Sequence, residues 1–234
     1  MKNVINGRFD PSTPQISPGD LPRDGVLIMD ACPVTALGMK RVLTEYCGIT
    51  APVNYVQSLA GIPAGIVNAP VALLIMDICG EKESVLDGLR LLANLRTSHP
   101  TMKMVICTGF TDHHVLELLV SSEANGILLK HEPVMALEQC VVSIMSDDTQ
   151  WLSPKAKLLL AKTTSKKKPL TAWELDVLAY LFSGLSVSRV AQMLHRDTRT
   201  VSMHKRNAMA KLGFNNDSEL FAQGTWMAKT GPTA

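Results

Sequence analysis

The chain has 234 residues, a length that suits two ordinary domains, and 46% of them are hydrophobic and 19% charged. This composition is typical of globular proteins and excludes a largely disordered chain. The formal net charge is only +2, but residues 164–234 hold 10 Lys and Arg against 5 Asp and Glu. This basic excess favours nucleic acid as a partner of the C-terminal part.

Cysteine usage and the lengths of the apolar runs predict a cytoplasmic protein that enters no membrane. No stretch reaches the roughly 18 consecutive apolar residues that span a bilayer, and the N-terminus lacks the apolar core of a secretory signal. The cysteines are odd in number and widely spaced, which predicts a reducing compartment without a disulfide framework. They are Cys32, Cys47, Cys79, Cys107 and Cys140.

The first 24 residues and the stretch that follows them differ sharply in composition and hydrophobic pattern. Residues 1–24 are rich in Pro, Ser, Asn and Asp, which predicts a disordered tail with no assignable role. Residues 25–147 alternate apolar runs with helical patterns, and five βα units predict a flavodoxin-like α/β fold with a parallel sheet. Strands are expected at 25–30, 53–56, 71–77, 102–108 and 126–130, each followed by a helix.

Polar residues stand at the ends of four of these strands: Asp30, Asp77, Thr108 and Lys130. In open α/β sheets, ligand chemistry lies beyond the carboxyl ends of the strands. Two carboxylates at that edge could hold a cation, and one could attack a phosphoryl group. For any one of these residues alone, the simpler interpretation is a strand end where the chain turns polar.

Taken together and in this order, the four residues resemble the receiver domain of two-component response regulators, over roughly Gly25 to Met145. The resemblance implies Asp77 as the phosphoacceptor, Thr108 as the switch hydroxyl and Lys130 as the lysine that contacts the phosphoryl group. Asp30 matches the first acid of the metal-binding pair, so Asp30 and Asp77 are the expected Mg²⁺ ligands. A sensor kinase is the phosphoryl donor that the resemblance implies.

The receiver pattern is incomplete. Ala31 stands in place of the second acid, the usual Met-Pro after the acceptor is Cys79-Gly80-Glu81, and Ile127 replaces an aromatic residue. Because Mg²⁺ needs oxygen ligands in near-octahedral geometry, we expect at most a weak Mg²⁺ site, no other cofactor, and inefficient phosphorylation of Asp77. A redox or soft-metal pair of Cys32 and Cys79 is an alternative, but small buried fillers are the expectation.

Residues 148–169 are expected to link two domains. WLSPKAKLLLAK predicts one short helix, with Ser153 as its cap and Pro154 in its first turn. The following TTSKKKP reads as a flexible basic linker. Lys166 to Lys168 either contact phosphates or form a solvated run that keeps the linker extended.

Residues 170–228 predict four helices. Thr171 and Glu174 have the spacing of a capping box at the start of the first helix, and Gly184 ends it. Ser186 is the expected cap of the second helix. The residues expected to face inward are Leu175, Leu178, Ala179 and Phe182, then Val187, Val190, Ala191 and Leu194.

The third helix of this domain, Thr198 to Leu212, has two distinct faces and is capped by Asp197 or Thr198. Its inward residues are Val201, Ala208, Met209 and Leu212. Its outward residues are Arg199, Ser202, Met203, Arg206 and Ala210. A tight turn followed by a basic helix is typical of a helix-turn-helix unit, whose second helix enters the major groove of DNA.

The motifs LTAWELDVL, Gly184-Leu185-Ser186 and Lys211-Leu212-Gly213 resemble the DNA-binding domain of NarL/FixJ (LuxR-type) regulators, closest to the Rcs-type branch. Trp173 departs from the family, which usually has Arg or another polar residue there. The resemblance and the helical faces imply that Arg199, Ser202, Met203 and Arg206 face bases. Lys205 and Lys211 are expected to contact phosphates or solvent.

We therefore expect a regulator of transcription, not an enzyme, that binds double-stranded DNA as a dimer and works largely without phosphorylation. The partner chain is either a second copy or a related LuxR-type regulator. Two alternatives remain: a conventional regulator activated by phosphorylation of Asp77, and an adaptor that controls a partner regulator by protein contact. An enzyme is disfavoured because neither a phosphate-binding loop nor a nucleophile-base pair is present.

Overall fold

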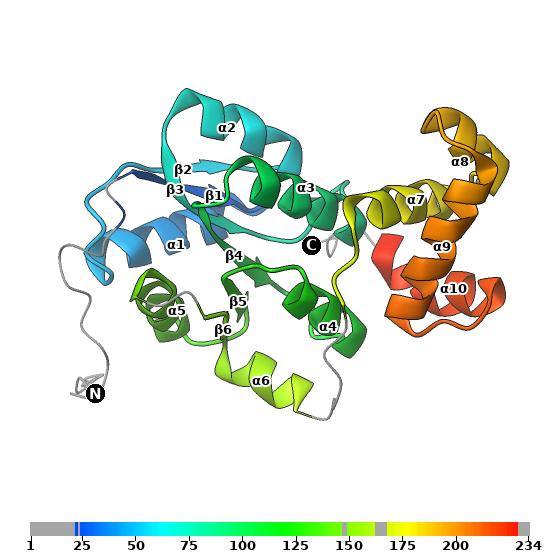
Figure 1. Ribbon diagram of the computed structural model, residues 1–234. Helices are drawn as coiled ribbons and strands as arrows, with labels where there is room; N and C mark the ends of the chain where they lie inside the picture. The colour runs from blue at the N-terminus through cyan, green and yellow to red at the C-terminus, as the bar shows by residue number, and fades with distance from the viewer. Residues whose placement is uncertain (1–21, 23, 147–148, 162–167, 229–234) are drawn as a thin grey trace.

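The computed structural model describes residues 22, 24–146, 149–161 and 168–228 (Figure 1). The expected N-terminal tail lies almost wholly outside these residues, as do Lys166, Lys167 and the last six residues of the chain. No helix within the described ranges is both long enough and apolar enough to cross a membrane.

The N-terminal half is built on one parallel sheet of six strands in the order β2-β1-β3-β4-β5-β6. This confirms the predicted α/β fold. The strands are β1 (Gly25–Met29), β2 (Val53–Val56), β3 (Val71–Met76), β4 (Lys103–Thr108), β5 (Gly126–Leu129) and β6 (Trp151–Leu152). The helices are α1 (Pro33–Glu45), η1 (Leu59–Gly61), α2 (Ile62–Asn68), α3 (Val85–Ser98), α4 (His113–Ser121), α5 (Met135–Ser146) and α6 (Pro154–Leu160).

Helices cover both faces of the sheet because alternate strand residues point to opposite sides. Val26, Ile28 and Leu73 belong to the core beneath α1 and α5. Leu27 and Met29 belong to the core beneath α2, α3 and α4. The strands are apolar on both sides, as their uninterrupted apolar runs predict for a parallel sheet.

The sequence prediction did not include β6. Trp151 and Leu152 pair in parallel with Gly126 and Ile127 of β5, and Ser153 then caps α6 by accepting a hydrogen bond from the Ala156 amide. A strand of two residues is too short to show a period in the sequence. The first part of the expected linker is therefore integral to the N-terminal half, which we call the receiver-like domain (residues 24–161).

The C-terminal domain (residues 168–228) contains the four predicted helices and a final short turn. They are α7 (Ala172–Phe182), α8 (Val187–Met193), α9 (Thr198–Leu212), α10 (Asp217–Gln223) and η2 (Gly224–Ala228). In Figure 1, α7 lies next to α3, and α8 to α10 extend away from the sheet.

The two domains share one hydrophobic core cluster. Leu89 of α3 and Leu175 and Leu178 of α7 all belong to it. At its edge the Arg90 Nε donates to Asp176 Oδ1 at 2.6 Å, in a partly buried pair that joins α3 to α7. The domains are thus held together mainly by apolar burial, with an ion pair at the rim.

Candidate sheet-edge pocket and nucleic-acid interface

The four polar residues at the strand ends converge, as expected from parallel strands. The register is fixed by backbone hydrogen bonds, in which the Asp77 amide donates to Met29 O at 3.0 Å and the Lys130 amide to Thr108 O at 2.9 Å. Asp30, Asp77 and Thr108 are all buried. The sheet thereby brings two carboxylates and a hydroxyl together at one edge, and we call these three residues together with Lys130 the sheet-edge pocket.

Lys130 bridges the two carboxylates. Its Nζ lies 2.7 Å from Asp30 Oδ2 and 2.7 Å from Asp77 Oδ2. The other oxygen of each carboxylate accepts a backbone hydrogen bond, from the Cys32 amide to Asp30 at 2.9 Å and from the Ile78 amide to Asp77 at 2.7 Å. Both carboxylates are therefore already neutralised or hydrogen-bonded by groups of the chain itself.

The electrostatics of the pocket follow from burial and this bridge. Burial raises the pKa of the Asp77 carboxyl above its ordinary value, and Lys130 opposes that shift. Burial alone lowers the pKa of Lys130, but Asp77 and Asp30 more than offset this, so its pKa is raised overall. The ammonium therefore stays charged at neutral pH and serves two carboxylates at once.

The described residues of this pocket do not fit a tight Mg²⁺ site. Ala31 is exposed next to Asp30 and supplies no carboxylate. The two carboxylates that are present both contact the Lys130 ammonium. A divalent cation bound there would either displace this ammonium or be repelled by it.

The loop after Asp77 is braced against a neighbouring element. Glu83 accepts hydrogen bonds from the amides of Leu59 and Ala60 at 2.8 and 3.0 Å, which fastens the loop to η1. A Cβ at Gly80 would come within 2.2 Å of the Glu83 carboxylate, so a side chain there would push Glu83 out of its present position. The unusual Cys79-Gly80-Glu81 sequence thus belongs to a distinct, anchored loop.

The two cysteines near this edge differ from each other. Cys79 is buried, and burial raises the pKa of its thiol to about 12, as expected for an inert filler. The expectation that Cys32 is also buried was wrong, because it lies exposed at the N-terminus of α1, where hydrogen bonds to Thr35 lower its pKa. Both thiols are free.

Capping contacts define the helix-turn-helix as the sequence predicts. Thr171 and Glu174 form the capping box of α7, and Gly184 has a φ of +88°, the left-handed conformation that favours glycine. The Ser186 side chain accepts from the Arg189 amide at the start of α8, and Asp197 accepts from the Arg199 amide at the start of α9. These caps fix the first residues of α8 and α9.

The predicted faces of α9 are also present. Its inward residues Val201, Ala208, Met209 and Leu212 are all buried. On the opposite side Arg199, Met203 and Arg206 are exposed and Ser202 is half-buried. The Arg206 Nε donates to its own helix at Ser202 O, 3.3 Å away, so the guanidinium lies along the outer face.

The two lysines expected to contact phosphates or solvent are engaged inside the domain. Lys205 Nζ lies 2.7 Å from Asp217 of α10, and its side chain is only 13% exposed. Lys211 Nζ contacts Glu174 at 2.7 Å and the Pro169 carbonyl at 2.9 Å. A phosphate contact by Lys205 would therefore compete with Asp217.

The sequence analysis did not predict the contact of Trp173 with α9. Its ring stacks on His204 of α9, with centroids 6.3 Å apart, and the Arg196 guanidinium lies 4.6 Å from the Trp173 centroid. These residues are distant in sequence, so no local pattern connects them. The departure at Trp173 thus fixes α9 and the preceding turn against α7.

Comparison with known proteins identifies the C-terminal domain. Residues 168–222 match the family "Bacterial regulatory proteins, luxR family". The chain carries a LuxR-family domain. It is also 25% identical to the transcriptional regulatory protein RcsB of Escherichia coli (strain K12) over 201 residues, which cover 83% of this chain and 91% of RcsB. The Fimbriae Z protein of Salmonella typhimurium is 25% identical over 199 residues, 83% of this chain and 93% of that protein.

The architecture agrees with this homology. Salmonella enterica serovar Typhimurium RcsB, in a structure bound to promoter rprA with the phosphomimetic BeF3-, covers 89% of this chain with a TM-score of 0.59 and 21% identity. The isolated REC domain of the same RcsB covers 59% of this chain with a TM-score of 0.53 and 16% identity. The LuxR-family domain is thus joined to a receiver fold, as in RcsB.

Proposed function

We propose that this protein is a cytoplasmic regulator of transcription that binds double-stranded DNA through the outer face of α9. The observation that carries the proposal is that Arg199, Met203 and Arg206 are exposed on one side of a helix whose other side is fully packed. A helix of this kind fits the major groove, where arginine can make bidentate contacts with guanine. RcsB, a homologue of this chain, has been solved as dimers bound to DNA.

The outer face of α9 stays accessible while the two domains are packed together. The main contacts between the domains join α7 and η2 to α3, with a further contact between α4 and η2, while Arg199 and Arg206 of α9 remain exposed. DNA binding therefore does not require the receiver-like domain to release the LuxR-family domain. This supports action without a phosphorylation-driven rearrangement.

The sheet-edge pocket supports the same conclusion. Lys130 bridges both carboxylates, and Ala31 leaves the pocket one acid short. A phosphoaspartate at Asp77 would lack the metal ligands that offset its charge, so a phosphoryl group would supply little free energy to shift the domain between states. Mg²⁺ binding is expected to be weak. The competing proposal is conventional activation, in which a sensor kinase phosphorylates Asp77.

A dimer is proposed because one LuxR-family domain buries too little surface for tight specific binding. The adjacent helices α1 and α5 carry exposed apolar residues near their N-termini, which we call the α1–α5 patch: Val34 and Leu37 on α1, Val134 just before α5 and Met135 at its start, with exposures of 77, 52, 59 and 51%. A second copy or a related LuxR-type regulator would cover this α1–α5 patch. Leu37→Glu should shift the protein towards monomer in analytical ultracentrifugation, whereas Lys40→Glu on the same helix should not.

The experiment that tests the proposed function is binding to DNA by the full chain. Duplexes selected from a random pool are titrated with the protein, alone and with a related LuxR-type regulator, and fluorescence anisotropy reports affinity. Saturable, sequence-preferring binding supports the proposal. An adaptor would instead bind the related regulator and show no sequence preference of its own, which would overturn it.

A further inference from the structure

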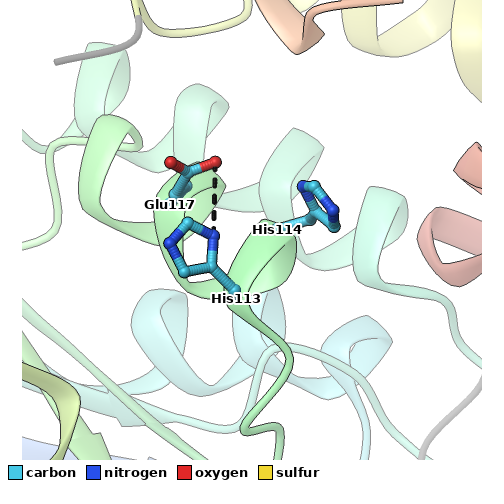
Figure 2. Close-up of side chains that lie close together, drawn as sticks. All are labelled: His113, His114 and Glu117. Atoms are coloured by element: carbon cyan, nitrogen blue, oxygen red, sulfur yellow. Dashed lines mark ion pairs between the residues drawn. The ribbon is translucent and has the colours of Figure 1, made fainter. Parts of the chain in front are cut away.

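Three potential metal ligands, none of them a residue of the sheet-edge pocket, gather at the start of α4. Figure 2 shows His113 and Glu117 facing each other across one helical turn, with His114 beside them. The His113 Nδ1 lies 3.7 Å from Glu117 Oε2. One ligand atom from each of the three residues can be chosen so that all lie within 4.8 Å of one another, a property shared by no other His, Cys, Asp and Glu group in the described ranges.

The spacing of this cluster suits a metal ion. Residues four apart on a helix share a face, so His113 and Glu117 can bind one ion in the manner of paired ligands on a metal-binding helix. A tetrahedral ion with bonds of about 2.0–2.1 Å separates its ligand atoms by roughly 3.3 Å. The 3.7 Å distance between His113 and Glu117 is already close to this value. To complete the site, the His114 side chain would have to rotate towards the ion, and it has room to do so because it is exposed.

The chemistry of the ligands selects the ion. Imidazole suits zinc and the neighbouring late transition metals, whereas Mg²⁺ and Ca²⁺ prefer all-oxygen sites. Two imidazoles and one carboxylate leave a fourth position for water, as in open zinc sites. Glu117 is buried, with its side chain 8% exposed, so the packed helix holds this carboxylate in a defined position as a ligand.

The first turn of a helix disfavours a cation, because its free amides point towards the site. Two features oppose this effect here. The Asp112 carboxylate caps α4 by accepting from the amides of His114 and Val115, which places a second negative charge at this end. Glu117 supplies the charged ligand itself.

His114 also contacts the other domain. Its ring stacks on Trp226 of η2, with centroids 6.4 Å apart and an interplanar angle of 14°. The indole Nε1 of Trp226 is buried without a hydrogen-bond partner among the described residues, so stacking, not a hydrogen bond, holds His114 to Trp226. A rotation of His114 would break this contact between α4 and η2.

We propose that His113, His114 and Glu117 bind a divalent ion of the zinc class, and that binding draws His114 off Trp226. The ion thus alters the contact between the receiver-like and LuxR-family domains. The site is independent of Asp77 and of DNA, so the outcome of its test does not depend on the proposed function.

Zn²⁺ titration of untagged full-length protein by calorimetry tests the site, in a Cys32→Ser background that removes the exposed thiol. We expect one ion per chain, with affinity lowered by about tenfold or more in His113→Asn, His114→Asn and Glu117→Gln. His131→Asn, which changes an exposed histidine outside the cluster, is the matched control. Because His114 is exposed, its variant stays informative if the Glu117 variant fails to fold. Absent binding, or equal loss in His131→Asn, would overturn the site.

Tryptophan fluorescence tests the effect on the domain contact. Zn²⁺ should change the emission of the wild-type protein and of Trp173→Phe, but not that of His114→Asn. Trp226→Phe should bind Zn²⁺ with at least wild-type affinity and lose the change in emission. An unaltered change in Trp226→Phe would contradict the movement of His114 away from Trp226.

Discussion

The sheet-edge pocket and the outer face of α9 both contain charged groups. In the pocket these groups are largely buried and paired with one another, whereas on α9 they are exposed. In the pocket, Asp30 and Asp77 are buried and share the Lys130 ammonium. On α9, Arg199 and Arg206 are exposed, and the Arg206 side chain donates a hydrogen bond to Ser202 O of its own helix. Buried charges that compensate each other stabilise one state, whereas exposed cations remain available to an outside partner.

The largest effect is expected inside the pocket. Lys130→Met leaves two buried carboxylates without their cation, so the free energy of unfolding at neutral pH should fall by about 3–5 kcal/mol. Urea unfolding measures this loss. Lys157→Met, at an exposed lysine of α6, is the control and should change little. Adding Asp30→Asn to Lys130→Met should recover part of the stability, and a loss unaffected by that second change would argue against the charge explanation.

The same variant should show a defined dependence on pH. Burial raises the pKa of Asp77 above its ordinary value, so the folded protein holds that proton more tightly than the unfolded chain. Without Lys130 the pKa rises further. A raised carboxyl pKa favours folding at low pH, so the deficit of Lys130→Met should be small near pH 4 and grow as pH rises. A deficit that is constant from acidic to neutral pH would contradict this.

The next effect is expected on α9. Arg206→Ala should weaken binding to a selected duplex by about 1–3 kcal/mol if its guanidinium makes a bidentate base contact, and should relax the preference at one base pair. Anisotropy titrations of wild type and variant give both values. Arg41→Ala, at an exposed arginine of α1, provides the matched control. A folded Arg206 variant with unchanged affinity and preference would remove this residue from the interface.

A smaller effect is expected at Lys205, which lies on α9 but is paired with a carboxylate of the same domain. Its ammonium is held by Asp217, so Asp217→Asn should free it to contact phosphate. Affinity for all duplexes should then rise modestly, and the slope of log affinity against log salt should steepen by about one unit. An unchanged slope would show that Lys205 does not reach the DNA backbone.

Patterns with a regular period were the most predictable from sequence. The four inward residues of α9 follow the helical repeat and are all buried. For α7 the prediction chose Ala179 and Phe182, which are half-buried, and omitted Val177 and Leu181, which are fully packed. The reason is that α7 lies between α3 on one side and α8 and α9 on the other, so it has no single inward face.

Features that depend on distant residues were not predictable in detail. The convergence of Asp30, Asp77, Thr108 and Lys130 follows from strand ends, but the bridge made by Lys130 depends on side-chain positions that no local pattern fixes. The stacking of Trp173 on His204 and the stacking of His114 on Trp226 likewise join segments far apart in the chain. Sequence periodicity reports on one element at a time, whereas these contacts require the packed fold.

The central claim is that DNA affinity does not depend on phosphorylation of Asp77. The most direct measurement is the dissociation constant for a selected duplex, with wild type and Asp77→Ala each measured with and without a small phosphodonor and Mg²⁺. We predict the same affinity in all four conditions, and labelling of Asp77 only after Ala31→Asp restores the missing acid. Labelling of the wild type, with a rise in DNA affinity and dimerisation that Asp77→Ala abolishes, would contradict the claim.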